Sequence, residues 1–164
     1  MRLLLVVLVL FPAIAAAGGD RLWQNTEYGM SVEQVLSAVP GSHASRSPSK
    51  LYGGALGLVE GEPTQIAQQP FLPRFYFKDG RLVQVMLSMT SSVDAAEAQA
   101  VFGDVVAALR TKYGREVLST AKDFTLEAEF QSGKTNIGVV LFTVGDPVLN
   151  IYYQQRLAED ARRL

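Results

Sequence analysis

Cysteine is absent from this chain of 164 residues. Its absence excludes disulfide bonds, thiolate metal sites, cysteine nucleophiles and a lipid anchor on an N-terminal cysteine. Histidine is nearly absent as well, since His43 is the only one in the sequence. One imidazole makes neither a metal site nor a general base without placed partners, and the sequence puts none beside it. We therefore predict no metal, no cofactor and no catalytic residue.

A strong charge of either sign is also missing, because 15 Lys and Arg residues nearly balance 16 Asp and Glu residues. A chain without a basic face binds phosphate backbones poorly, so nucleic acid is not a predicted partner. Beyond residue 17 no apolar run is long enough to cross a bilayer. We expect no transmembrane segment in the mature chain.

Residues 1–17 have the pattern of a secretory signal peptide. Arg2 supplies a positive start, residues 3–11 are an unbroken apolar run, and Ala15 and Ala17 offer small-residue cleavage positions. We expect export to the periplasm or the extracellular space after cleavage. Residues 18–164 then have the length of one ordinary domain.

The familiar catalytic and nucleotide-binding motifs are missing: the nucleophile elbow, the H-E-x-x-H helix, the P-loop and the EF-hand loop. The nearest carboxylate pairs are Glu60 with Glu62 and Glu127 with Glu129. Residues two apart on a strand share a face, so each pair suits an acid and a base or ligands of a hard cation. No third ligand accompanies either pair, and solvated strand faces explain them more simply.

The first helix has a clear start and stop. Gly29 suits a turn, Ser31 is placed as the N-cap, and Gln34 completes a capping box for a helix over residues 32–38. Pro40 and the following glycine end it. The alternation over residues 21–28 predicts a short strand before it, and residues 41–54 are predicted as a polar loop.

Asp79-Gly80 is the signature of a two-residue type I′ hairpin. It places Lys78 opposite Arg81, Phe77 opposite Leu82 and Tyr76 opposite Val83. Regular alternation then divides the hairpin into two largely apolar faces, which predicts a central position in the sheet. One face holds Phe75, Phe77, Leu82 and Met86, and the other holds Tyr76, Val83, Val85 and Leu87.

A long amphipathic helix is predicted over residues 93–113, capped by Ser91 or Ser92 and ended by Gly114. The remaining strands are predicted at 55–60, 64–69, 115–119, 124–131, 136–143 and 148–154, and a short amphipathic helix at 156–164. The predicted class is α+β: an antiparallel sheet with the two main helices on one face. Two halves, each a helix followed by strands, are compatible with a diverged repeat, although no sequence identity supports one.

The stretch from Gly29 to Val35 resembles the G-M-S/T-x-x-x-V helix start of the outer-membrane assembly lipoprotein E family and of related β-lactamase-inhibitor-protein-like exported domains. The hairpin turn, the end of the long helix at Lys112 to Gly114 and the final strand are similar to those of small exported bacterial proteins. The chain departs from the lipoprotein pattern in lacking the lipidated cysteine. The resemblance implies a role in binding.

Our first hypothesis is therefore a non-enzymatic exported domain that binds a protein or an envelope component. Candidate contact residues are His43, Arg46 and Lys50 in the polar loop, together with Tyr153. Tyr152 and Tyr153 are neighbours in a predicted strand, so only one can face the helices, and the other is left for contacts. The alternative is a binder of a small apolar ligand between the long helix and the sheet. A hydrolase or metal-dependent enzyme using the scattered carboxylates is the third hypothesis.

Overall fold

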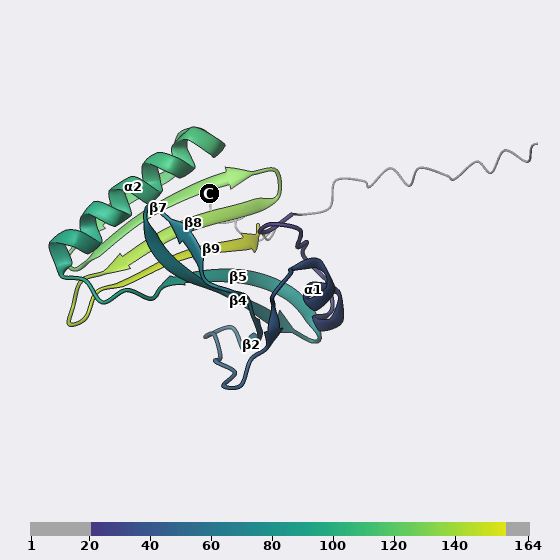
Figure 1. Cartoon of the computed structure of the whole chain (residues 1–164). Helices are drawn as coiled ribbons and strands as arrows, with labels where there is room; N and C mark the ends of the chain where they lie inside the picture. The colour runs from purple at the N-terminus through teal and green to yellow at the C-terminus, as the bar shows by residue number, and fades with distance from the viewer. Residues whose placement is uncertain (1–20, 157–164) are drawn as a thin grey trace, which may run out of the picture.

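The structure is a computed structural model that describes residues 21–156. The predicted signal peptide and residues 157–164 of the predicted last helix lie outside the described residues. The described part forms one antiparallel sheet of nine strands with two helices (Figure 1). The predicted α+β class is confirmed.

The helices are α1 (Val32–Ala38) and α2 (Ala95–Tyr113). The strands are β1 (His43–Ala44), β2 (Leu56–Glu60), β3 (Thr64–Ile66), β4 (Gln69–Lys78), β5 (Arg81–Met89), β6 (Leu118–Lys122), β7 (Thr125–Ser132), β8 (Thr135–Phe142) and β9 (Val148–Gln155). The predicted polar loop thus contains one short strand, β1, which pairs with β2.

The sheet order is β1-β2-β4-β5-β9-β8-β7-β6, and β3 pairs with β4 beside this path. The β4–β5 hairpin lies inside the sheet, between β2 and β9, as predicted. Strands β6 to β9 form the predicted meander, in which every neighbouring pair is antiparallel. The last strand, β9, joins the meander to the hairpin by pairing with both β8 and β5.

Helix α1 has the predicted capping box: Ser31 Oγ accepts from Gln34 N, and Gln34 Oε1 accepts from Ser31 N at 2.8 Å. The turn before it is fixed to the sheet. Gly29 N donates to Leu82 O at 2.8 Å, and Leu82 N donates to Met30 O at 2.8 Å. The helix buries Val35 completely.

Helix α2 begins later than predicted, because its N-cap is Asp94, whose side chain accepts from Glu97 N at 2.9 Å. Ser91 is occupied elsewhere, donating to Gln69 Oε1 at 2.6 Å. Gly114 ends the helix with φ +85°, as predicted. The helix packs on β7, β8 and β9.

Both helices share one hydrophobic core with the same face of the sheet. The core contains Val35 and Val39 from α1, Val101 and Val105 from α2, and Val59, Phe75, Val85, Leu87, Val139 and Ile151 from the strands. The register places these strand residues opposite one another across neighbouring strands, so they lie on one side. We call this side the core face and the other side the open face.

Residues 21–28 form a turn and not the predicted strand. Thr26 N and Thr26 Oγ1 both donate to Trp23 O, at 3.0 and 2.6 Å, and Gln24 has φ +50°. Only a single bridge, Arg21 with Glu27, has strand-like pairing. Thr26 is fully buried, and its two hydrogen bonds to Trp23 O hold the turn together. The loose alternation of this stretch gives no sign of these bonds.

The β4–β5 hairpin has the predicted type I′ turn, with φ +51° at Asp79 and +72° at Gly80. Beyond the pair Phe77 and Leu82, however, Tyr76 lies opposite Gln84. Val83 is therefore the extra residue of a β-bulge, and the predicted pair of Tyr76 with Val83 is wrong. The bulge reverses the alternation, so Val85 and Leu87 lie on the core face and Met86 on the open face.

The cap assignment gives a direct test. Replacing Asp94 by Ala leaves an amide of the first turn of α2 without its acceptor, and we expect a loss of about 1 kcal/mol in the free energy of unfolding. Ser92→Ala is the matched control, with an expected change within about 0.5 kcal/mol. Urea unfolding of both variants is the measurement. If Ser92→Ala lost more unfolding free energy than Asp94→Ala, the N-cap would be the predicted serine and not Asp94.

Candidate functional site

The open face is the part of the sheet that neither helix covers. Its central row runs across the strands from Glu60 and Arg74 through Met86, Tyr152 and Gly138 to Glu129. These side chains are polar or aromatic at most positions, whereas the opposite face is apolar. The open face is therefore the side of the sheet whose polar side chains can contact a ligand.

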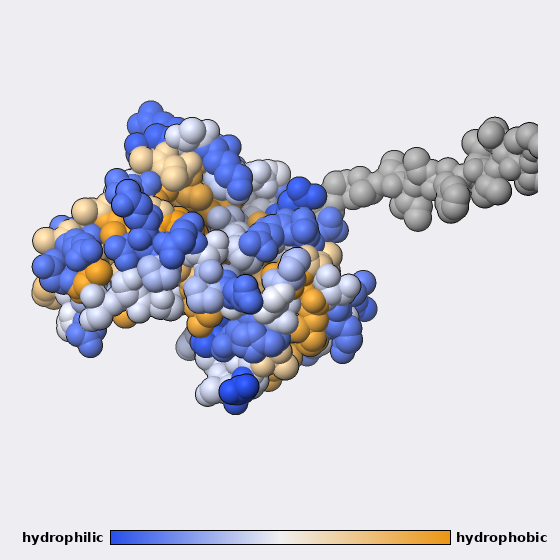
Figure 2. All heavy atoms as spheres, in the orientation of Figure 1, coloured by the Kyte–Doolittle hydropathy of each residue, from blue (hydrophilic) through white to orange (hydrophobic). Residues whose placement is uncertain are grey.

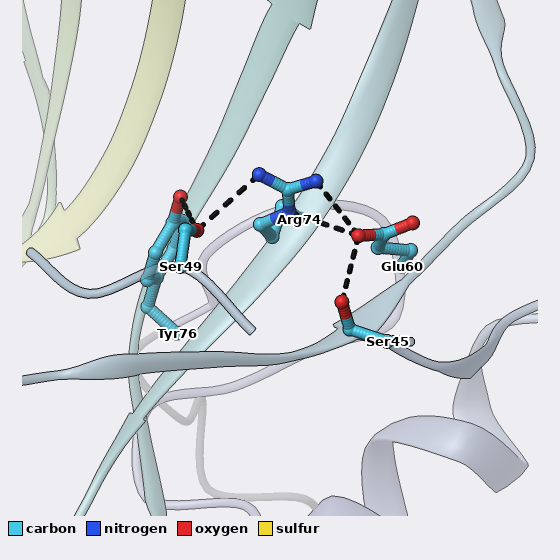
Figure 3. A network of polar contacts seen from close by, with 5 residues as sticks. All are labelled: Ser45, Ser49, Glu60, Arg74 and Tyr76. Atoms are coloured by element: carbon cyan, nitrogen blue, oxygen red, sulfur yellow. Dashed lines mark hydrogen bonds and ion pairs between the residues drawn. The ribbon is translucent and has the colours of Figure 1, made fainter. Parts of the chain in front are cut away.

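A polar network closes one end of this row (Figure 3). Arg74 donates from Nη2 and Nε to Glu60 Oε1, at 2.7 and 3.1 Å, and from Nη1 to Ser49 Oγ at 3.2 Å. Ser45 donates to the same carboxylate oxygen at 2.8 Å, and Ser49 Oγ lies 3.0 Å from Tyr76 Oη. Two serines of the predicted polar loop are thus fixed to the sheet.

Ser45 and Arg74 also set the ionisation of Glu60. The hydrogen bond from Ser45 lowers the pKa of Glu60 below 4.5, burial opposes the shift, and the Arg74 guanidinium adds to it. Glu60 and Arg74 have side-chain exposures of 18% and 29%. The ion pair is neutralised within itself, so it holds the loop and leaves no free charge for a ligand.

The loop residues predicted as contacts are exposed. His43 lies on β1 opposite Glu60, and Arg46 and Lys50 flank the two serines that bind the sheet. The structure brings His43 close to Glu60. The positive charge of a protonated His43 adds a small further lowering to the pKa of Glu60. It gives neither Arg46 nor Lys50 a side-chain hydrogen bond within residues 21–156.

Tyr153 is the predicted contact residue that the structure corrects. It is only 6% exposed and lies on the core face beside Ile137, where burial raises the pKa of its hydroxyl. Tyr152 takes the open face instead. The choice between the two depends on which strands flank β9, and the sequence of β9 does not contain that information.

Tyr152 lies flat across the neighbouring strand. Its Oη donates to Glu129 Oε1 on β7 at 2.9 Å, and its ring covers Gly138 on β8. A Cβ at Gly138 would overlap the ring, so only glycine allows this arrangement. Burial raises the pKa of Tyr152 above its ordinary value, and the Glu129 carboxylate strengthens the shift. The hydroxyl stays protonated as a donor.

A second row on the open face consists of side-chain amides. Gln84 on β5, Gln154 on β9, Asn136 on β8 and Gln131 on β7 lie opposite one another across four adjacent strands. Gln131 accepts from Arg156 Nη1 at 3.0 Å. Within residues 21–156, the amides of Gln84 and Gln154 have no hydrogen-bond partner. The sequence alone does not reveal this row, because its members are far apart in the chain.

A hollow of about 630 Å³ opens where this row meets the hairpin. Tyr28, Tyr52, Lys78, Gln84 and Gln154 line it, with Leu51 and Val83 between them. Tyr28 is 38% exposed, and Tyr52 stands fully in solvent. The volume is within the range of about 300–1,000 Å³ that is usual for small-molecule sites. This hollow and the amide row together are our candidate site.

Two other hollows differ from it in character. One of about 260 Å³ lies between the end of α2 and the sheet, near Tyr113, Ile137 and Tyr153. Another of about 470 Å³ lies at the β6–β7 and β8–β9 turns, beside the exposed Phe124, Phe142 and Val144. Figure 2 shows a mainly hydrophilic visible surface on which hydrophobic residues form small separate patches.

The carboxylates within residues 21–156 do not assemble into a site. Glu60 pairs with Arg74 and Glu129 accepts from Tyr152. Among residues 21–156 no three His, Asp or Glu side chains lie close enough to hold a metal ion. In the same part of the chain, no helix has the length and apolar character needed to cross a membrane. No protein-family model, curated protein or solved structure was found to match this chain.

The pKa shift of Glu60 predicts a pH-dependent stability. A carboxylate whose folded pKa is lowered stabilises the fold above its unfolded pKa, and this stabilisation is lost as pH falls through the folded pKa. We expect Glu60→Gln to be less stable than the wild type near neutral pH, with a difference that shrinks below pH 4.5. Urea unfolding across this pH range is the measurement. Glu62→Gln is the control, and a pH-independent difference for Glu60→Gln would contradict the assignment.

The contact of Tyr152 with Gly138 predicts a coupling between the two residues. Gly138→Ala forces the ring away and should cost about 1–3 kcal/mol of stability. In a Tyr152→Ala background the same change should cost much less, because the ring is gone. Unfolding free energies of the four variants give the coupling.

Gly103→Ala provides the matched control for the glycine replacement. Gly103 is exposed in α2 and has no atom within 4 Å of an added Cβ, so the change should stabilise the chain by about 0.5–1 kcal/mol. Equal costs of Gly138→Ala with and without the Tyr152 ring would show that the contact has no energetic role.

Proposed function

We propose that this chain is an exported, non-enzymatic binding domain that recognises a component of the cell envelope on the open face of its sheet. The observation that carries the proposal is the pair Gln84 and Gln154, two adjacent amides beside a hollow of about 630 Å³. Hydrogen-bonding groups without an internal partner, next to exposed tyrosines, are suited to contacts with another molecule.

The arrangement of the layers supports this choice of face. Both helices and the hydrophobic core occupy the core face, so any ligand contact by the central strands has to use the other side. Two long side chains of the open face are held in place, since Arg74 and Tyr152 are each fixed by hydrogen bonds to a carboxylate. Their polar groups are therefore already engaged, and the groups left for a ligand are those beside the hollow.

Export is the second part of the proposal and is supported by the pattern of residues 1–17 alone. The absence of an enzymatic role is supported by the state of the carboxylates, because Glu60 and Glu129 are already engaged with Arg74 and Tyr152. His43 lies near Glu60, and no nucleophile among residues 21–156 donates to its ring. His43 therefore lacks the hydrogen-bonded nucleophile that a catalytic pair requires.

An apolar-ligand binder between α2 and the sheet has less support. The α2 side chains facing the sheet are packed, with Val101, Val105 and Leu109 exposed by 5%, 1% and 7%. The hollow that touches both layers has about 260 Å³ and includes Lys112 and Arg21. That volume is below the usual range for ligand sites. The open-face hollow is larger, at about 630 Å³, and is lined by the unpartnered amides of Gln84 and Gln154.

Cosedimentation with isolated bacterial envelope fragments tests the proposal. We expect the purified wild-type protein to bind saturably, and the double variant Gln84→Ala and Gln154→Ala to lose about tenfold or more in affinity. Loss of two hydrogen bonds of about 0.5–1.5 kcal/mol each gives that order of magnitude.

The matched control removes two exposed glutamines outside the candidate site, Gln65 on β3 and Gln99 on α2. This variant should bind like the wild type. Either no saturable binding by the wild type, or an equal loss in both double variants, would refute recognition through the open face.

A further inference from the structure

The amide row contains an unsatisfied group that the fold itself does not explain. Asn136 is 9% exposed, and its Oδ1 is buried without a hydrogen-bond partner. Buried polar atoms in folded proteins nearly always have a partner, so this orphan marks the row as a place where the fold leaves hydrogen-bonding capacity unused. By register Asn136 lies between Gln154 and Gln131, in the middle of the row.

The composition of the candidate site indicates which ligand chemistry it suits. Carboxamides donate and accept at once, which matches hydroxyl groups that also do both. Tyr28 and Tyr52 offer aromatic rings with a polar tip, and such rings stack on flat, weakly apolar faces. Sugar rings combine these two properties, with hydroxyls at the edge and C–H groups on the face.

The charges beside the hollow favour an acidic ligand. Lys78 is exposed and brings an ammonium group to the lining, and among residues 21–156 no Asp or Glu lines the hollow. An anionic substituent next to Lys78 would gain a charge-assisted hydrogen bond without facing a carboxylate.

The spacing of the row fits a chain and not a single sugar. The four amides belong to adjacent strands, and neighbouring strands lie about 4.8 Å apart. Successive units of a linear polysaccharide repeat at a similar length, so one unit can meet one strand. The row leads from the hollow at Gln84 and Gln154 to Gln131 and Arg156 at its other end.

We propose that the open face binds an acidic saccharide chain, with a sugar ring against Tyr28 and Tyr52 in the hollow and its hydroxyls paired to the amides of Gln84 and Gln154. The anionic substituent lies beside Lys78. This inference rests on the proposed function, since it names the ligand of the same face. A peptide ligand is the outcome that would replace it.

Titration with two defined probes tests the ligand class: a linear tetrasaccharide of hexuronic acid units and the matching neutral hexose tetrasaccharide. We expect the acidic probe to shift the side-chain amide NMR signals of Gln84 and Gln154. Lys78→Gln should weaken this binding by about tenfold, the effect of one hydrogen bond to a charged group. Tyr52→Ala should also weaken it, and Phe124→Ala, at the distant turn, should not.

Protease-treated envelope fragments separate this inference from the proposed function. Binding that survives digestion of the protein in the fragments, and that the acidic tetrasaccharide displaces, supports the saccharide. Binding to intact fragments that digestion abolishes, with no response to either tetrasaccharide, overturns the saccharide and leaves the binding function standing. Failure to bind intact fragments and both probes overturns both. Equal affinity for the two tetrasaccharides overturns the role of Lys78.

Discussion

The β-bulge at Val83 is the constraint on which the two faces of this sheet depend. With Phe77 opposite Leu82 and Tyr76 opposite Gln84, the alternation of β5 is reversed at one residue. Everything beyond that point follows, because β5 sets the register of β9 and β9 sets that of β8. Without the bulge, Gln84 would face the core and Val85 the solvent. The bulge therefore decides both which residues form the core and which amides form the candidate site.

Two glycines give the open face its shape. Gly138 lets the Tyr152 ring lie over β8, and Gly57 does the same for Arg74, whose Cδ would be 2.7 Å from an added Cβ. Both long side chains are thereby laid across the sheet and joined to a carboxylate on another strand. Glycine weakens a strand, and an aromatic ring packed over it compensates. The result is a polar surface on which the amides of Gln84 and Gln154, beside the hollow, keep free hydrogen-bonding groups.

The sequence predicted the fold well wherever local chemistry decides the structure. The capping box at Ser31 and Gln34, the Asp79-Gly80 turn and the glycine after α2 are each set by a few neighbouring residues, and all are present. The turn at residues 21–28 and the cap at Asp94 were missed, because several local hydrogen-bonding patterns fit those stretches equally well. Of the predicted contact residues, three are exposed on the polar loop and Tyr153 is buried.

By itself, the sequence determined the α+β class, the antiparallel meander, the central hairpin and the lack of cysteine chemistry. These depend on periodicity, turn residues and composition, which neighbouring residues carry. Only the tertiary structure decided which residues of β5 face the core, that Tyr152 lies on the open face, and that the amides from Gln84 to Gln131 form a row. A residue's face on a strand depends on its pairing with distant strands, and one extra residue in that pairing exchanges core and surface.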